Sequence, residues 1–264
     1  MNTRTLLCLI IFTLAGIAST ASAMDVGIIA PTDKKSRAEV YYEAFERDIE
    51  QEWGFGDGSY TGLQEEKRVV GRFTFNPQRF WGLSLEIAGT DSDGSEDVAP
   101  MFGAGAHIVL LERGGFYTSA FGRATWITGV EYKNHYEYTN GDDFVRGTWT
   151  RDEAYLEYGM GLQLGYEWQP CASARVTTYA GAMTSFIDDT ESEERESGTY
   201  FYSGSMTGAE TFSMKDSSVD MEEAHVAQMF AGVEVALLPV DAGIRVEGRF
   251  YDRTSLSASV FWNF

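Results

Sequence analysis

Ten charged residues fall at alternate positions of stretches that otherwise alternate between apolar and polar residues. Five are arginines and five are glutamates: Arg72, Glu86, Arg123, Glu157, Glu167, Arg175, Glu234, Arg245, Glu247 and Arg249. If these side chains face one narrow interior, opposite charges pair across it, because an unpaired buried charge is costly. The alternative is that they line a narrow path for ions or small solutes and set its selectivity.

A run of acidic residues offers a second chemistry, the binding of a divalent cation. Asp91, Asp93 and Asp97 surround a turn glycine and resemble the start of a calcium loop. The distal glutamate of an EF-hand is missing at the required spacing, so the calcium loop is incomplete. Solvation of an acidic surface is the alternative, and it applies equally to the cluster at 191–196. No cofactor is expected.

The elements that position these residues are strands, because successive side chains of a strand point to opposite faces. Alternation predicts strands over 38–53, 69–75, 81–87, 101–111, 116–129, 156–168, 176–186, 227–237, 244–251 and 256–264. Short turns near 77, 113, 170 and 240 alternate with longer polar connections. The longest connections are predicted over 131–152 and 188–222, and residues 24–37 are predicted to be a short periplasmic lead-in outside the wall.

The last predicted strand has one apolar face and one mostly polar face. Leu256, Ala258, Val260, Trp262 and Phe264 share the apolar face. This pattern resembles the C-terminal strand of Gram-negative outer-membrane β-barrels, whose terminal aromatic is read by the barrel-assembly machinery. The resemblance implies an all-β, closed antiparallel barrel in the outer membrane. It also implies the assembly machinery, outer-membrane lipid and lipopolysaccharide as partners, with divalent cations bridging the acidic loops to lipopolysaccharide.

The first predicted strand decides the number of strands in the barrel. Alternation of Val40 and Tyr42 with Glu39 and Tyr41 predicts a strand over 38–53, but an apolar stripe also fits a helix there. With this strand the wall has about ten strands, and without the first hairpin it has eight. An even count of strands favours ten.

Aromatic residues are predicted to gather where the short turns lie. They are Trp81, Phe116, Tyr166, Trp168, Trp262 and Phe264. Outer-membrane barrels have short periplasmic turns, long outer loops and a girdle of aromatic residues at each interface. These six residues are therefore expected to form the periplasmic girdle.

The beginning of the chain has the features of a secretory signal peptide over 1–23. Arg4 precedes an apolar stretch, and Ala21-Ser22-Ala23 forms a small-residue cleavage site. The remaining 24–264 is expected to be a single barrel domain, in which Cys171 is the only cysteine and no internal disulfide forms. The formal charge of −20 argues against nucleic acid as a partner.

An enzymatic function can be judged against the catalytic residues of two classes of barrel hydrolase. Omptin proteases use acidic pairs with a histidine at the top of the barrel, and Asp91 with Asp93 resembles such a pair. The sequence nevertheless contains no Asp-His or Asp-x-His motif. Lipid A deacylases of the barrel class place a serine near a histidine, yet His107, His135 and His225 have no serine at close spacing. No complete catalytic constellation is found, so no catalytic residue is assigned.

The sequence therefore predicts a non-enzymatic outer-membrane barrel with a structural or surface-interaction role. Its lumen is expected to be filled largely by paired charged side chains, because the interior of a small barrel is just wide enough for inward-facing side chains to fill it. A narrow pore for ions or small solutes is the alternative. An omptin-like or lipid-modifying hydrolase carried on the loops is the third hypothesis.

Overall fold

The computed structural model describes residues 27, 29–52, 59–140, 143–202, 208–216, 221–223, 227–250 and 255–264. The predicted signal peptide over 1–23 and the candidate His225 lie outside these residues. The strands are β1 (Ser36–Glu52), β2 (Ser59–Gln78), β3 (Trp81–Ser92), β4 (Ala99–Arg113), β5 (Phe116–Asn140), β6 (Asp143–Cys171), β7 (Ala174–Tyr202), β8 (Gly208–Asp216), β9 (Met221–Glu223), β10 (Ala227–Leu237), β11 (Ala242–Phe250) and β12 (Ser255–Asn263). A single 3-10 turn, η1 (Leu238–Val240), joins β10 to β11.

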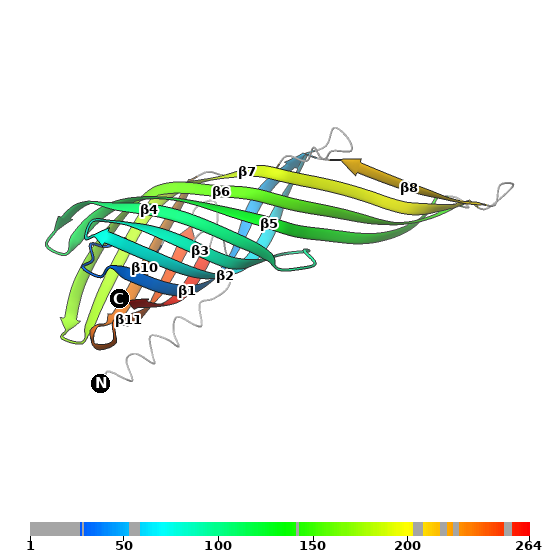
Figure 1. Ribbon diagram of the computed structural model, residues 1–264. Coiled ribbons are helices and arrows are strands. Elements are labelled where there is room, and N and C mark those ends of the chain that lie inside the picture. Colours follow the sequence, from blue (N-terminus) through cyan, green and yellow to red (C-terminus); the bar gives the residue numbers. More distant parts are fainter. Residues whose placement is uncertain are drawn as a thin grey trace.

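The wall is a closed antiparallel barrel of ten strands, β1 to β7 and β10 to β12 (Figure 1). Each strand pairs with its neighbours in chain order, β12 pairs with β1, and β7 pairs with β10. β8 extends the sheet from β7 outside the wall, and β9 pairs with β1. The predicted fold class is thus confirmed.

The first strand resolves the alternative between ten and eight strands. β1 pairs with β2 from Ser36 opposite Phe75 to Glu52 opposite Ser59, and it also pairs with β12. The strand prediction over 38–53 is correct, and the helix alternative is wrong. Glu39, Tyr41 and Glu43 are buried in the barrel while Val40 and Tyr42 are exposed, so the amphipathic alternation belongs to a strand.

The outside of the wall carries an apolar band. On β6 the exposed side chains Tyr158, Met160, Leu162, Leu164, Tyr166 and Trp168 follow one another at every second position. This stretch is 11 residues long, which is the length a tilted strand needs to cross the hydrocarbon core. The alternate residues face the lumen, where Glu157 and Gln163 are buried. Among the described residues, no helix is long and apolar enough to span a membrane.

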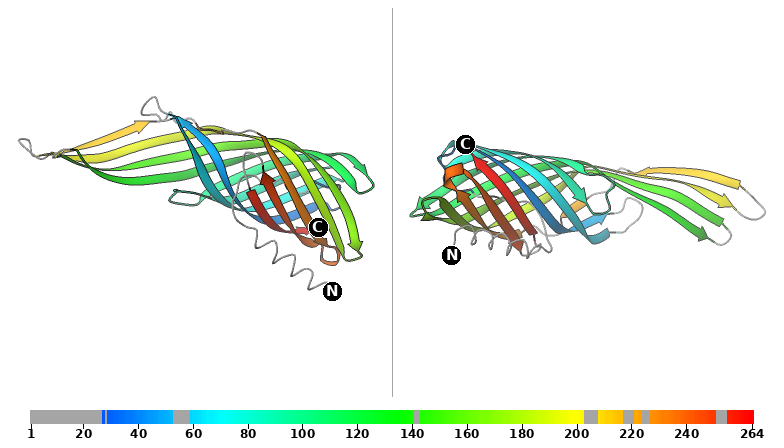
Figure 2. Two further views of the ribbon diagram at one scale, coloured as in Figure 1. Left: turned by 180° about the vertical axis from the view of Figure 1, so that it is seen from behind. Right: turned by 90° about the horizontal axis from the view of Figure 1, so that it is seen from below.

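Two stretches predicted as loops are strands instead. Residues 131–140 and 143–152 belong to β5 and β6, and 188–202 and 208–216 belong to β7 and β8. Together, 131–140, 143–154, 188–202 and β8 form a four-stranded sheet that projects far beyond the barrel, here called the arm (Figures 1 and 2). Threonines and aromatics give these segments high strand propensity. Both faces of the arm carry polar residues, which weakens the apolar alternation that marks the wall.

The arm leaves the wall at two irregularities of pairing. The register between β5 and β6 shifts between Thr128 and Val130, and the register between β6 and β7 shifts at Ala154 and Tyr155. Gly129, at the first shift, has a φ of 72°, a left-handed conformation that glycine adopts without strain. Such bulges bend a strand and increase its twist.

Candidate functional site

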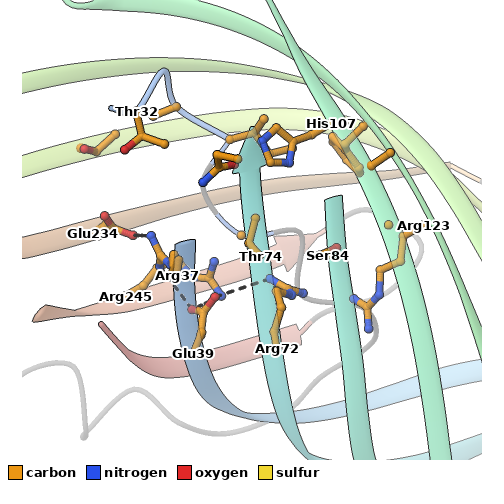
Figure 3. Close-up of a pocket in the computed structure, with 18 of the residues that line it drawn as sticks. Thr32, Arg37, Glu39, Arg72, Thr74, Ser84, His107, Arg123, Glu234 and Arg245 are labelled. Atoms are coloured by element: carbon orange, nitrogen blue, oxygen red, sulfur yellow. Dashed lines mark hydrogen bonds and ion pairs between the residues drawn. The ribbon is translucent and has the colours of Figure 1, made fainter. Parts of the chain in front are cut away.

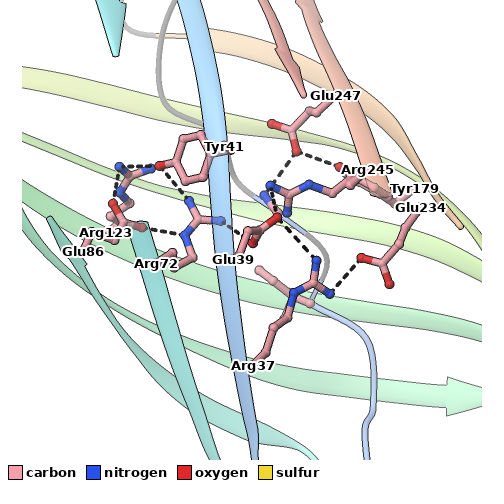
Figure 4. A network of polar contacts seen from close by, with 12 residues as sticks. Arg37, Glu39, Tyr41, Arg72, Glu86, Arg123, Tyr179, Glu234, Arg245 and Glu247 are labelled. Carbon is pink, nitrogen blue, oxygen red and sulfur yellow. Dashed lines mark hydrogen bonds and ion pairs between the residues drawn. The ribbon is translucent and has the colours of Figure 1, made fainter. Parts of the chain in front are cut away.

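Strands β1, β2, β3 and β5 bring one half of a charged layer into the lumen. Arg72 donates from Nε to Glu86 Oε1 at 2.6 Å and from its terminal nitrogen to the Tyr41 hydroxyl at 3.2 Å. Arg123 donates to the same hydroxyl at 3.2 Å and pairs with the Glu86 carboxylate. Two guanidinium groups thus share one carboxylate and one phenol (Figure 4).

The other half of the charged layer joins β1 to β10 and β11. Arg245 pairs with Glu39 at 2.9 Å, and Glu39 also lies 3.4 Å from Arg37. Arg37 pairs in turn with Glu234 at 2.7 Å. Glu39 also lies 3.7 Å from Arg72, so the two halves meet at this carboxylate (Figure 4).

A second ion-paired group lies toward the arm. Arg68 contacts Glu66 at 2.7 Å and Glu157 at 2.9 Å, and all three side chains are fully buried. The Tyr155 hydroxyl donates to Glu66 at 2.8 Å. On β11, Glu247 pairs with Arg249 at 3.2 Å. Glu247 also accepts a hydrogen bond from the Tyr179 hydroxyl at 2.9 Å.

An apolar cluster lies in the lumen beside this second group and is called the apolar layer below. Its buried side chains are Tyr41, Val70, Ala99, Met101, Ile127, Val130, Tyr155 and Ile187, with Ala88 and Tyr132 packed against them. They come from every wall strand from β1 to β7. Close packing of this kind leaves little room for water.

The segment before β1 enters the barrel, whereas a lead-in outside the wall was predicted. Gln163 donates from Nε2 to the Gly27 carbonyl at 2.8 Å and accepts from the Ile29 N–H at 3.0 Å. The Ser119 hydroxyl donates to the Ile29 carbonyl at 2.9 Å, and the Gly27 N–H donates to Glu247 at 3.2 Å. Wall side chains therefore satisfy the backbone of this segment, which explains how a short irregular stretch is tolerated inside.

Gly27 lies against the charged layer. Its φ is 76°, and a Cβ built on it would collide with the guanidinium groups of Arg72 and Arg245. Beside the segment a cavity of about 90 Å³ remains, lined by Arg37, Arg72, Arg123 and Arg245 among others (Figure 3). This volume holds only a few water molecules.

The same segment is clamped at the rim by exposed ion pairs. Arg79, in the turn between β2 and β3, contacts Asp33 at 3.1 Å and Glu112 at 2.6 Å. The hydrogen bond that Arg79 donates to Glu112 is the main cause that raises the pKa of Arg79 above its usual value, and Asp33 adds to it. Lys34 pairs with Asp241 at 2.8 Å. The segment thus ties together three turns at the end of the barrel where the turns are short.

The ten charged residues predicted for the lumen do not all lie in one group. Glu86, Arg72, Arg123, Glu234 and Arg245 belong to the charged layer, and Glu157, Glu247 and Arg249 lie deeper toward the arm. Glu167 and Arg175 are partly exposed at the rim and lie 3.6 Å apart. Eight of the ten thus meet in buried contacts, and two lie at the mouth.

Several members of these layers were not predicted from the sequence. Arg37 was missed because it was assigned to the lead-in over 24–37, and Glu39 because the structure of 38–53 was left open. Glu66 and Arg68 were missed because the second strand was taken to begin at 69. The informative pattern was the continued alternation of Glu66, Arg68, Val70 and Arg72. The role of Gln163 could not be predicted from the sequence, because it depends on contact with Gly27 and Ile29, which are distant in the chain.

The six predicted girdle residues lie near the end with short turns, on the outside. Phe116, Tyr166, Trp168, Trp262 and Phe264 are exposed, and Trp81 is partly so. Phe116 and Tyr166 have ring centroids 4.5 Å apart, and Tyr166 and Trp168 lie 6.0 Å apart. Such rings suit the interface between lipid and water.

The terminal strand lies in the wall between β11 and β1. Within β12, Ala258, Val260 and Trp262 are exposed on the outside and Leu256 is partly exposed, while Ser257, Ser259 and Phe261 are buried inside. The Phe264 backbone joins β1 through Lys35, whose N–H donates to the Phe264 carbonyl at 3.1 Å.

The other candidates remain apart from each other. Asp91, Asp93 and Asp97 are exposed, and among the described residues no three His, Cys, Asp or Glu side chains gather as metal ligands. His107 lines the cavity inside the barrel, and His135 lies on the arm, where its Nδ1 is 2.9 Å from the Thr148 hydroxyl. Cys171 is exposed in the turn before β7.

A closed wall with an apolar exterior and a buried polar interior defines the class of this protein. It is a transmembrane β-barrel of the outer-membrane type, because closure and internal pairing satisfy every backbone group in lipid. Short turns lie at one end and the long arm at the other, which corresponds to the periplasmic and outer sides.

Comparison with known proteins adds likeness in architecture. No protein-family model and no curated protein matches the chain. The translocator domain of the autotransporter NalP from Neisseria meningitidis has 9% identity and a TM-score of 0.41, covering 99% of this chain and 96% of that chain. The toluene transporter TodX of P. putida has 10% identity and a TM-score of 0.30, covering 90% and 93%. An outer membrane channel from Pseudomonas putida F1 has 10% identity and a TM-score of 0.36, covering 92% and 100%.

Proposed function

We propose that this protein is a closed, non-conducting outer-membrane barrel whose role is to carry the arm beyond the membrane for surface interaction. The barrel is the anchor, and the arm is the functional surface. No group of side chains described above combines a nucleophile, a base and an orienting acid, so no reaction is proposed.

The filled lumen is the observation that supports a closed barrel. From the rim inward the lumen holds the segment 29–35, then the charged layer, then Arg68 with its two carboxylates beside the apolar layer. Each level draws side chains from several strands, so an ion moving along the axis would have to separate buried ion pairs and packed apolar groups. Both are costly.

The size of the arm supports the surface role. β6 has 29 residues, far more than the 9 to 11 or so that a strand needs to cross the hydrocarbon core. Ordered pairing continues to Asn140 opposite Asp143 and to Tyr202 opposite Gly208. A protein that needed only to span the membrane would not require these extensions.

The pore remains a second candidate because of the cavity beside the segment 29–35. Five arginines line it, and Gly27 and Ile29 are held there by hydrogen bonds donated by Gln163 and Ser119 and by the bond that the Gly27 N–H donates to Glu247. Withdrawal of the segment would widen this cavity on the periplasmic side. Conduction would additionally need a path through the apolar layer.

Two partners follow from the proposed location. The outward residues of β12, ending in Trp262 and Phe264, are available for recognition by the assembly machinery while the barrel is still open at that strand. The acidic loop with Asp91, Asp93 and Asp97 would meet lipopolysaccharide through bridging divalent cations.

Single-channel recording tests the proposal. The chain from Met24 is refolded into planar bilayers beside an Arg245→Ala variant, and folding is verified by circular dichroism and by heat-modifiable mobility on gels. We expect no steady current from the wild type across a wide voltage range. A steady conductance that changes in Arg245→Ala would establish the pore instead.

A further inference from the structure

The arm ends in an open strand edge. In the described part of the chain β8 pairs only with β7, in nine consecutive pairs from Asp216 opposite Glu194 to Gly208 opposite Tyr202. No register shift interrupts these pairs. The far side of β8 therefore presents a regular row of backbone donors and acceptors, which is a template for another strand.

This edge lacks the usual protection against strand addition. Natural edges are guarded by prolines, bulges or lysines. β8 contains no proline, and its one lysine, Lys215, pairs at 2.5 Å with Glu193 on the neighbouring strand β7. The lysine charge is thereby drawn toward the hairpin and away from the open side.

The opposite edge of the arm is treated differently. Near the barrel, β5 is covered by the loop after β3, where the Glu96 N–H donates to the Glu131 carbonyl at 2.8 Å and Ser95 bridges to Tyr132. Lys133 follows on this edge, 3.5 Å from Glu96. The part of β5 nearest the barrel is thus covered, whereas no described strand pairs with the outer side of β8.

An aromatic row crosses the arm and ends at β8. Tyr136, Gly147, Gly198 and Phe212 lie directly opposite one another on the four strands. A Cβ on either glycine would collide with the ring of Tyr136 or Phe212, so both rings lie over the centre of the sheet. The Tyr200 ring lies 5.0 Å from Phe212. Ring faces of this kind attract cations.

The charge of the arm indicates which kind of partner would bind at the β8 edge. Residues 131–140, 143–154, 188–202 and 208–216 contain 13 acidic and 5 basic residues, a formal charge of −8. A second copy of the arm would bring the same charge and be repelled, whereas a basic partner would be attracted. The Tyr136 hydroxyl contacts the Glu196 carboxylate, which places an acid beside the aromatic row.

We infer that the open edge of β8 is a docking site for an extended cationic polypeptide segment, which adds to the arm as a fifth strand. Backbone hydrogen bonds to β8 supply affinity that does not depend on the sequence of the added strand. Lysines or arginines at alternate positions of that strand lie next to the aromatic row and contact its ring faces. The inference rests on the proposed surface role of the arm.

The experiment uses a short fluorescent peptide of alternating lysine and valine. It is titrated by fluorescence anisotropy into the refolded protein in nanodiscs of zwitterionic phosphatidylcholine, with empty nanodiscs as the control. We expect saturable binding at low ionic strength. Methylation of alternate backbone nitrogens keeps the charge of the peptide but removes edge hydrogen bonds, and should weaken binding about tenfold.

Two protein variants localise the effect. Glu193→Gln frees Lys215 to guard the edge and should weaken binding roughly threefold to tenfold. Glu137→Gln removes the same charge from a residue paired with Arg146, away from β8, and should leave binding nearly unchanged.

Several results would overturn the inference. They are absence of binding at low ionic strength, equal binding of the methylated peptide, equal effects of the two variants, and self-association of the protein through β8 in cross-linking. Bilayer recording reports on the lumen alone. A conducting barrel that still binds the peptide would refute the closed lumen and leave the edge inference intact. A silent barrel that does not bind the peptide would refute the edge inference and leave the closed lumen intact.

Discussion

The barrel interior and the arm are built from the same kinds of residue but place them in opposite surroundings. In the interior, Arg68 and its partners Glu66 and Glu157 are fully buried, so each charge depends on the others for solvation. In the arm, Arg146 and Glu137 lie 3.3 Å apart with most of both side chains exposed. Water solvates each of these charges whether or not the pair forms. The Arg68 pairs are therefore indispensable, whereas the exposed pair of Arg146 and Glu137 is incidental.

The two regions also differ in how they use aromatic side chains. In the wall, exposed rings such as Phe116 and Tyr166 face outward near the rim, where lipid or its interface would cover them. In the arm, Tyr136 and Phe212 cover two glycines of a single sheet that has no second layer among the described residues. A one-layer sheet is only marginally stable in water. The arm is thus the region expected to respond to a partner.

Removal of a buried arginine should produce the largest effect. Arg68→Met leaves Glu66 and Glu157 buried without their cation, and we expect a loss of about 3 to 5 kcal/mol in the free energy of unfolding. Urea titration of the protein in lipid vesicles, followed by tryptophan fluorescence, measures it. The matched variant Arg146→Met in the arm should cost less than about 1 kcal/mol. Similar losses of unfolding free energy in both variants would contradict the claim that ion pairs matter more in the interior than in the arm.

A valine in the centre of the arm should produce a local effect of intermediate size. Gly147→Val drives a branched side chain into the Tyr136 ring, and overpacking of this kind costs about 1 to 3 kcal/mol. Hydrogen exchange should become faster across the arm while protection of the wall is unchanged. Thr150→Val, on the opposite face, is the control and should exchange like the wild type. Faster exchange throughout the wall would show that the arm and barrel unfold together.

Acidification should produce the smallest effect, confined to the end of β8 that carries Lys215. Hydrogen bonds from Lys215 and then Arg195 hold the pKa of Glu193 below its usual value. Because the pKa is lowered by folding, the contribution of Glu193 is present above its unfolded pKa near 4.5 and is lost as the pH falls through the lower folded value. Hydrogen exchange of β8 should therefore accelerate only below about pH 4.5, and Glu193→Gln should abolish that dependence.

The wall of the barrel could be predicted from sequence because lipid on one side and a polar lumen on the other impose a strict alternation. Leu156 to Trp168 is such a stretch, and the terminal strand is another. The arm escaped prediction because water lies on both faces, so Thr148, Trp149 and their neighbours show no apolar periodicity. Only the strand propensity of the individual residues remained to predict the arm, and strand propensity depends strongly on context.

The filled lumen could be predicted only in part. Alternating charges identified Arg72, Glu86 and Arg245, but partners depend on strand register, which a sequence does not reveal. The entry of the segment 29–35 depends on Gln163 and Ser119, two uncharged side chains from distant strands. Backbone hydrogen bonds of this kind leave no mark on composition.

The most direct test of the closed barrel is a single-channel recording of a chain that begins at Ser36. This chain lacks the segment inside the lumen but keeps all ten wall strands, the Arg68 group and the apolar layer. Heat-modifiable mobility on gels first verifies that it folds. Our account predicts that it stays silent, because Met101, Ile127 and their neighbours still fill the lumen. A steady current from this chain would contradict the account and make the segment the gate of a pore.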